Sequence, residues 1–251
     1  MNDMKTKIVI NDQFENIRAY VESIPFRNEN LGEAIYSARN TIYRNDECGI
    51  DLTIKSFKIP HLFNRFIYTF FRKSKAQRSY EYATKLLEMG INTPQPIAYI
   101  ETFSSGLLSR SYYVCRMIDS ANNVRHWETS PDRDKIIEGT ARMMALLHRN
   151  HVWHRDFTPG NILYDNDWNF YLIDINRMQF DVTSKRKLMS NFSGIHDESP
   201  EEIGKLARKY AQLTGNDIDT VTAEAVALNH KFWIKQYRKW KFKDWLKGMH
   251  R

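Results

Sequence analysis

The chain contains 251 residues, of which 42% are apolar and 13% aromatic, enough to bury at least one sizeable core. With 27% charged residues and no apolar run near the roughly 20 residues that span a bilayer, long disorder and membrane-spanning helices are excluded. The net charge of +7 is concentrated in residues 55–78, with seven Lys or Arg and no acid, and in residues 231–251, with eight and one acid, which favours a polyanionic partner.

In the first half of the chain, apolar periodicity predicts a small sheet with helices packed on it. The expected elements are a helix near 13–23 and strands near 33–43, 50–57, 97–101 and 111–117. A further helix begins at the cap Ser74 and runs to Met89, because Gly90 can end it in the left-handed conformation.

A polar connector at 119–126 predicts the boundary between two parts of one domain, residues 1–118 and 119–251. The second part begins with a helix near 132–150. A hairpin follows, with strands at 161–164 and 170–175, and the chain from Ser199 onward is mostly helical. The sequence therefore predicts an α+β fold, with an antiparallel sheet in the N-terminal part and helices in the C-terminal part.

The two cysteines, Cys48 and Cys115, lack the spacing of metal ligands, and no apolar run follows the first charged residues. These features predict reduced cysteines in a cytoplasmic protein. They argue against a disulfide scaffold and against a zinc site.

The segment from His154 to Asn161 reads His-Arg-Asp-Phe-Thr-Pro-Gly-Asn and matches the H-R-D-x-x-x-x-N catalytic loop of protein kinases. In that pattern Asp156 is the candidate base for the acceptor hydroxyl, and Asn161 is an oxygen ligand for Mg²⁺. His154 is more typical of a structural residue that holds the loop.

Asp174 ends the apolar run Tyr171-Leu172-Ile173, thirteen residues beyond Asn161. This position predicts a charged metal ligand that shares Mg²⁺ with Asn161. The alternative is that Asp156, Asn161 and Asp174 are ordinary loop and strand-end residues, but their combined spacing favours the catalytic interpretation.

Upstream, Lys55 at the end of Leu52-Thr53-Ile54 fits the strand lysine that holds the ATP phosphates, and Glu81 in the next helix can pair with it. Each signal is weak when taken alone. A strand-end lysine is often a solvated charge, and Glu81 can instead pair with Lys85 one helical turn away.

Several departures separate this chain from protein kinases. Thr158 stands where their catalytic loop has lysine, and Asp174 is followed by Ile-Asn-Arg instead of Phe-Gly. There is no G-x-G-x-x-G motif, so the expected phosphate-covering turn is 37–40, where Arg39 could contact phosphate. Ser199-Pro200-Glu201 is similar to an A-P-E segment, but a helix cap with proline at the first position explains it better.

With these motifs the chain resembles the lipopolysaccharide kinase (Kdo/WaaP) family over roughly residues 31–180. The matching segments are Lys55-Ser56-Phe57-Lys58, Gly90 to Pro96, the catalytic loop and, most distinctively, Leu172-Ile173-Asp174-Ile175-Asn176-Arg177. The resemblance implies a bilobal protein-kinase-like fold. It further implies ATP- and Mg²⁺-dependent phosphorylation of a Kdo or heptose hydroxyl in the lipopolysaccharide inner core.

Aromatic residues alternate with both basic segments, which suits contact with an anionic inner-membrane surface near a lipid-linked acceptor. For 231–251, membrane contact and core packing are equally compatible with the pattern, whereas for 55–78 we expect core packing. No nucleic-acid partner is expected. The alternatives are a kinase of a protein or small molecule, such as an aminoglycoside, and a non-catalytic binding module with the same fold.

Overall fold

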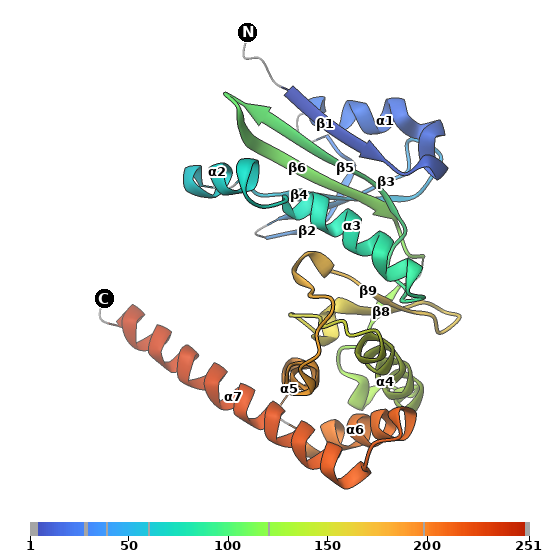
Figure 1. Cartoon of the computed structure of the whole chain (residues 1–251), viewed down its shortest axis with the longest axis vertical. Coiled ribbons are helices and arrows are strands. Elements are labelled where there is room, and N and C mark those ends of the chain that lie inside the picture. Colours follow the sequence, from blue (N-terminus) through green and yellow to red (C-terminus); the bar gives the residue numbers. More distant parts are fainter. Residues whose placement is uncertain are drawn as a thin grey trace. The chain divides into compact units, whose positions relative to one another are not determined.

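A computed structural model describes residues 5–27, 30–38, 40–59, 61–119, 121–197 and 199–248. By contacts, the chain divides into two compact units (Figure 1). The first unit is Met1–Asp119 together with Asp174–Asn176, and the second is Ser120–Ile173 with Arg177–Arg251. The short segment Asp174–Asn176 thus belongs by its contacts to the N-terminal unit.

The described residues of the first unit form a six-stranded antiparallel sheet with the order β1-β5-β6-β4-β3-β2. The strands are β1 Lys5–Ile10, β2 Glu33–Ser37, β3 Thr41–Asn45, β4 Leu52–Phe57, β5 Pro96–Ser104 and β6 Leu107–Arg116. The helices are α1 Arg18–Ser23, α2 Leu62–Phe70 and α3 Lys75–Glu88. The segment predicted as one strand near 33–43 is a hairpin of β2 and β3.

Helices cover both faces of this sheet (Figure 1). On one face, Phe14, Ile17 and Val21 pack against Leu52 and Ile54 of β4. Because side chains alternate along a strand, the neighbouring residues of β4 and β5 point to the other face, where Tyr99 of β5 contacts Tyr80 of α3 with ring centroids 5.5 Å apart. This alternation places Lys55 on the α3 face.

Helix α3 begins at the predicted cap, because Ser74 Oγ accepts a hydrogen bond from the amide of Gln77 at 3.1 Å. Gly90 follows its end with φ of +72°, the left-handed conformation that glycine adopts without steric cost.

The described residues of the second unit form a small antiparallel sheet, in the order β7-β8-β9, and four helices. The strands are β7 Asn122–Asn123, β8 Ile162–Tyr164 and β9 Phe170–Leu172. The helices are α4 Arg133–Arg149, α5 Lys185–Met189, α6 Pro200–Thr214 and α7 Ile218–Gly248.

Helix α4 is the central buried element of this unit, with Ile136, Met144 and Leu147 almost inaccessible to solvent. A Cβ atom added to Gly139 would lie 2.0 Å from the ring of Phe170, so only glycine permits this close approach of α4 to β9. Helix α6 begins as predicted, because Ser199 Oγ accepts from the amide of Glu202. The α+β kinase-like fold expected from the sequence is confirmed, and α2 is added to the N-terminal helices expected near 13–23 and 74–89.

Candidate active site

Lys55 and Asp174 meet in the first unit. The Lys55 ammonium donates a hydrogen bond to Asp174 Oδ1 at 2.7 Å, and the lysine side chain is 17% exposed. The same ammonium lies 5.6 Å from the centre of the Phe57 ring. Because β4 and its packing fix the lysine stem, the cation is held beside a carboxylate and an aromatic face.

Asp174 adopts an unusual backbone conformation, with φ of +54°. A non-glycine residue in the left-handed region is uncommon and often marks a functional site, although Asp tolerates it better than most. The side-chain amide of Asn176 also donates to Asp174 Oδ1, at 2.8 Å. The carboxylate is therefore oriented by two donors while its side chain stays 37% exposed.

The catalytic-loop residues lie in the second unit and are held by short local bonds. The side-chain Nδ2 of Asn161 donates to the backbone carbonyl of Asp156 at 2.8 Å. The backbone N–H of Asn161 donates to the backbone carbonyl of Thr158 at 2.9 Å. The backbone carbonyl of Asn161 in turn accepts a hydrogen bond from the backbone N–H of Ile173 at 3.0 Å. These bonds tie the loop to the residue that directly precedes Asp174 in the chain.

Arg177 is a site residue for which sequence reasoning assigned no role. Its Nη1 donates to Asp156 Oδ2 at 3.0 Å, so a guanidinium stands beside the candidate base. The only sequence signal was its place at the end of the Leu-Ile-Asp-x-x-Arg motif. Since Thr158 leaves the loop without its lysine, Arg177 supplies a cation at that carboxylate.

His154 has the predicted structural role, because it is buried and its Nε2 donates to the carbonyl of Ile173 at 3.1 Å. The His154 carbonyl accepts from Asn191 Nδ2 at 2.6 Å. Asn191 is buried and connects the loop to helix α4, because its Oδ1 lies 3.1 Å from His148 Nε2. Motif spacing gave no signal for Asn191 or His148.

The far end of this chain of hydrogen bonds reaches α6, where His148 Nδ1 lies 2.8 Å from the Tyr210 hydroxyl. Since Asn191 uses its amide group toward His154, its oxygen must accept, which assigns the proton of neutral His148 to Nε2. Burial lowers the pKa of His148 to about 4, so the imidazole is neutral at physiological pH, and burial raises the pKa of Tyr210 to about 12.

One predicted contact is replaced by others. Glu81 does not pair with Lys55; its carboxylate accepts from Lys73 at 2.7 Å and from Gln77 at 3.0 Å. Both partners are close to Glu81 in sequence, so these contacts form without bringing distant parts of the chain together. Arg39 lies outside the described residues.

Phe57 is buried as expected, but most other aromatic residues of the basic segments are more exposed than core packing would allow. In the first segment the expectation of core packing is wrong for Phe63, Phe66, Phe70 and Phe71, which lie on the surface in or next to α2. In α7, Trp233 donates from Nε1 to the carbonyl of His196 at 2.9 Å and is half-buried. Tyr237, Trp240, Phe242 and Trp245 beyond it are exposed.

The two cysteines are free, as predicted. Cys115 is buried in β6, and burial raises the pKa of its thiol to about 12, so this group is neutral and unreactive at physiological pH. Among the described helices, none combines the length and apolar composition needed to cross a bilayer.

A model of the lipopolysaccharide kinase (Kdo/WaaP) family matches residues 53–224, which include Lys55, the catalytic loop and Asp174. The chain belongs to this family. The match covers well over half of the chain and continues beyond residue 180, where the resemblance in the motifs ends.

Two known proteins are similar to this Kdo/WaaP family member. A 3-deoxy-D-manno-octulosonic acid kinase of Vibrio cholerae serotype O1 is 25% identical over 111 residues, which are 44% of this chain and 47% of that relative. The aligned segment thus spans about half of the relative's length. A structure of WaaP in complex with acyl carrier protein superimposes with a TM-score of 0.63 at 18% identity, covering 92% of this chain and 98% of that one. This likeness supports the fold.

Proposed function

We propose that this chain is an ATP-dependent kinase that phosphorylates a Kdo or heptose hydroxyl of the lipopolysaccharide inner core. The observation that supports the proposal most is the 2.7 Å contact between Lys55 and Asp174, residues that lie 119 positions apart. A nucleotide-binding lysine and a metal-binding aspartate are the pair that phosphoryl transfer requires, and membership of the family supports the proposed acceptor class.

In the proposed reaction, Asp156 accepts the proton of the sugar hydroxyl. The hydroxyl oxygen forms a bond to the γ-phosphorus, the bond from that phosphorus to the bridging oxygen breaks, and ADP leaves. Lys55 holds the nucleotide phosphates, so residues 1–118 serve as the nucleotide-binding part. Residues 119–251 carry the catalytic loop and the acceptor site.

Asn161 and Asp174 would hold Mg²⁺, which neutralises charge on the phosphates when bound. Both are oxygen donors, the kind of ligand Mg²⁺ prefers. Since the amide nitrogen of Asn161 is bonded to the Asp156 carbonyl, its amide oxygen is the atom available to a metal. Within the described ranges no group of three or more His, Cys, Asp and Glu could hold an ion, which suits an ion carried mainly by phosphates and water.

We assign to Arg177 the role of the missing catalytic-loop lysine. Its guanidinium already contacts Asp156 and can bind the transferred phosphoryl group with two parallel hydrogen bonds. Glu81 and Arg39 were expected to assist nucleotide binding; the contacts of Glu81 with Lys73 and Gln77 leave it a supporting role in positioning α3.

The acceptor is part of a lipid-linked glycan, so we also propose peripheral contact with an anionic membrane surface. The exposed aromatic residues of α2 and α7, each accompanied by Lys and Arg, support this contact.

A labelled-ATP screen tests the proposed activity. Purified protein with Mg·ATP is offered Kdo- and heptose-bearing inner-core oligosaccharides, a protein substrate and an aminoglycoside, and mass spectrometry locates the added phosphate. We expect transfer to the core sugars. Transfer to the protein or aminoglycoside and not to either sugar would refute the proposed acceptor.

A further inference from the structure

Helix α2 presents an apolar side to solvent. Leu62 is 70% exposed, Phe63 76% and Phe70 61%, and the helix has no buried residue. Leu62, Phe66 and Phe70 follow one another at four-residue spacing, so they lie on one face, with Phe63 beside them. A continuous exposed strip of this kind marks a surface that another phase or molecule covers.

The polar side of α2 is fastened to the sheet, which fixes the direction of the apolar side. Arg65 Nε donates to the carbonyl of Leu108 at 2.7 Å. The amide of Leu108 donates back to Thr69 Oγ1 at 2.9 Å. A nine-residue helix would be marginal in water alone, but here the fold holds it. Binding through α2 therefore requires no helix formation.

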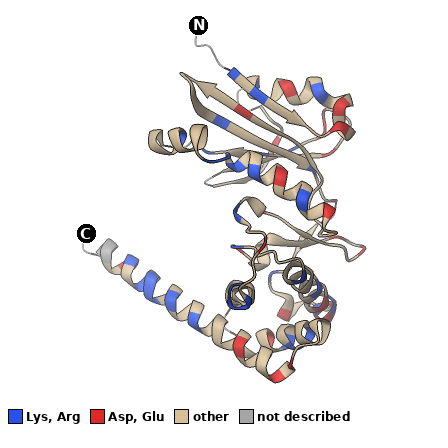
Figure 2. Cartoon of the chain, viewed as in Figure 1, with Lys and Arg blue, Asp and Glu red and all other residues tan. Residues whose placement is uncertain are grey.

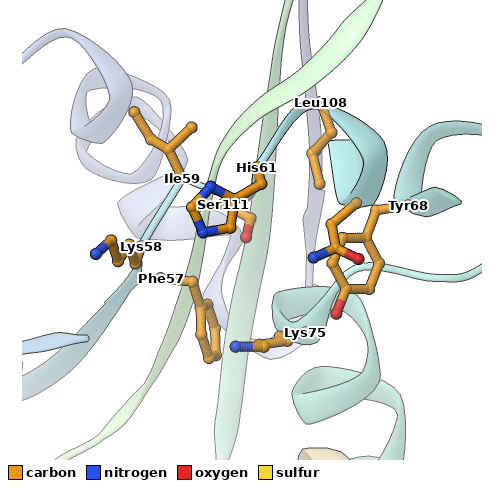
Figure 3. A pocket seen from close by; sticks show the side chains of 9 residues that line it. Phe57, Lys58, Ile59, His61, Tyr68, Lys75, Leu108 and Ser111 are labelled. Carbon is orange, nitrogen blue, oxygen red and sulfur yellow. The ribbon is translucent and has the colours of Figure 1, made fainter. Parts of the chain in front are cut away.

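The charged residues near this helix in the chain are all basic. Residues 55–78 contain no Asp or Glu, and Figure 2 shows no acidic colour along α2. The side of α2 that bears Asn64 and Tyr68 lines a pocket of about 280 Å³ together with Lys58, His61 and Lys75 (Figure 3). Its lining contains no carboxylate. The segment that carries the apolar strip thus has basic residues and no carboxylate, and the opposite side of α2 lines a pocket whose cations can attract anions.

We propose that α2 lies in the headgroup layer of an anionic lipid bilayer, with the apolar strip Leu62, Phe63, Phe66 and Phe70 inserted and basic residues of the segment 55–78 near the lipid phosphates. Lipid phosphate complements a surface that lacks carboxylates. A second copy of this chain would instead bring two basic surfaces together. This assignment rests on the proposed function in one respect, namely that the acceptor is attached to a lipid.

Sedimentation with vesicles tests the assignment. The full chain is mixed with vesicles of phosphatidylcholine alone or with phosphatidylglycerol added. The double variant Phe63→Ser/Phe70→Ser is compared with Phe26→Ser/Leu87→Ser, which removes two exposed apolar side chains elsewhere in the same unit. We expect preference for the anionic vesicles, a decrease in partition of at least about tenfold for the first variant, and less than about twofold change for the control.

The exposed helix α7 could also bind lipid, so hydrogen exchange is used to locate the contact with the bilayer. We expect the amides of 62–70 to become protected on anionic vesicles. Unchanged partition of Phe63→Ser/Phe70→Ser, or no added protection at 62–70, would overturn the assignment. A dimer in lipid-free solution that this variant dissociates would show that a second copy covers α2, which also overturns it.

Phosphorylation of a water-soluble core oligosaccharide separates this inference from the proposed function. The Phe63→Ser/Phe70→Ser variant should phosphorylate the soluble acceptor at the rate of the unsubstituted chain. No transfer by the unsubstituted chain to any core acceptor, with vesicle binding intact, would refute the kinase and leave the membrane surface standing.

Discussion

At the scale of single residues, Asp156, Asp174 and Lys55 are each held by a partner of opposite charge. Lys55 contacts Asp174, and Arg177 contacts Asp156. The Arg177–Asp156 pair is 45% and 34% exposed, and exposed ion pairs contribute only about 0–1 kcal/mol to stability. A pair that stabilises the fold so little agrees with the role proposed for Arg177 in the reaction.

Replacing Arg177 should therefore affect turnover far more than stability. We expect Arg177→Met to lower kcat by about 10²–10³-fold, as for the loss of a donor to the transition state, with less than about 1 kcal/mol change in the free energy of unfolding. Arg177→Lys should restore only part of the rate, because lysine keeps the positive charge but lacks the planar guanidinium with its paired donors. Steady-state kinetics and urea unfolding measure the two effects.

Arg142→Met is the matched control, because Arg142 pairs with Glu138 at 2.5 Å on an exposed side of α4. It should leave kcat unchanged. If Arg177→Met behaved like this control in both assays, the catalytic role of Arg177 would be refuted.

At the scale of elements, the catalytic loop is positioned by buried polar contacts from α4 and from the segment after α5. Asn191 joins the His154 carbonyl to His148, and His148 joins α4 to Tyr210 of α6. A buried network of this kind is rigid when every member is satisfied, and each unpaired member is costly.

Asn191→Leu should break this support without touching substrate. Two buried groups lose their partner, so we expect the free energy of unfolding to fall by about 1–3 kcal/mol. We also expect a lower kcat with little change in the KM for ATP. Ile203→Val, a core change in α6 that costs about 1 kcal/mol, should keep its kcat. Equal kcat values for the two variants would mean that Asn191 acts on stability alone.

His148 should make the stability of the protein depend on pH. Its pKa is lowered to about 4 in the folded state from 6.5, so the unfolded chain binds the proton first as pH falls. The free energy of unfolding should then decrease between about pH 6.5 and 4, by on the order of 3 kcal/mol, and be independent of this group above that range. Urea unfolding of the chain and of His148→Gln isolates the contribution, and equal pH slopes would contradict it.

At the scale of the whole molecule, the motifs predicted the candidate site residues, whereas the residues that surround them came only from the structure. Asp156, Asn161 and Asp174 could be proposed from the sequence because a loop and a hairpin fix their spacing locally. The strand pattern indicated Lys55 but not its partner. Glu81, the partner expected, pairs with nearby Lys73, and Lys55 contacts Asp174 instead. Asn191 and His148 come together only through tertiary packing, which spacing does not reveal.

The exposed helix α2 shows a different limit. The four-residue spacing of Leu62, Phe66 and Phe70 was present in the sequence, but an apolar stripe was expected to face a core. Which side of a helix meets the protein is decided by contacts such as Arg65 with Leu108, and these depend on the folded sheet. Periodicity therefore predicts an apolar face without predicting what covers it.

The most direct test of the account is the rate of phosphoryl transfer in a single turnover by Asp156→Asn at saturating Mg·ATP with a core-sugar acceptor. The account predicts a rate at least about a hundredfold below that of the unsubstituted chain, because the general base is lost. Stabilisation by Mg·ATP against heat should be retained, because Lys55, Asn161 and Asp174 remain. A rate within about threefold of the unsubstituted chain would contradict the assignment of Asp156 as the base.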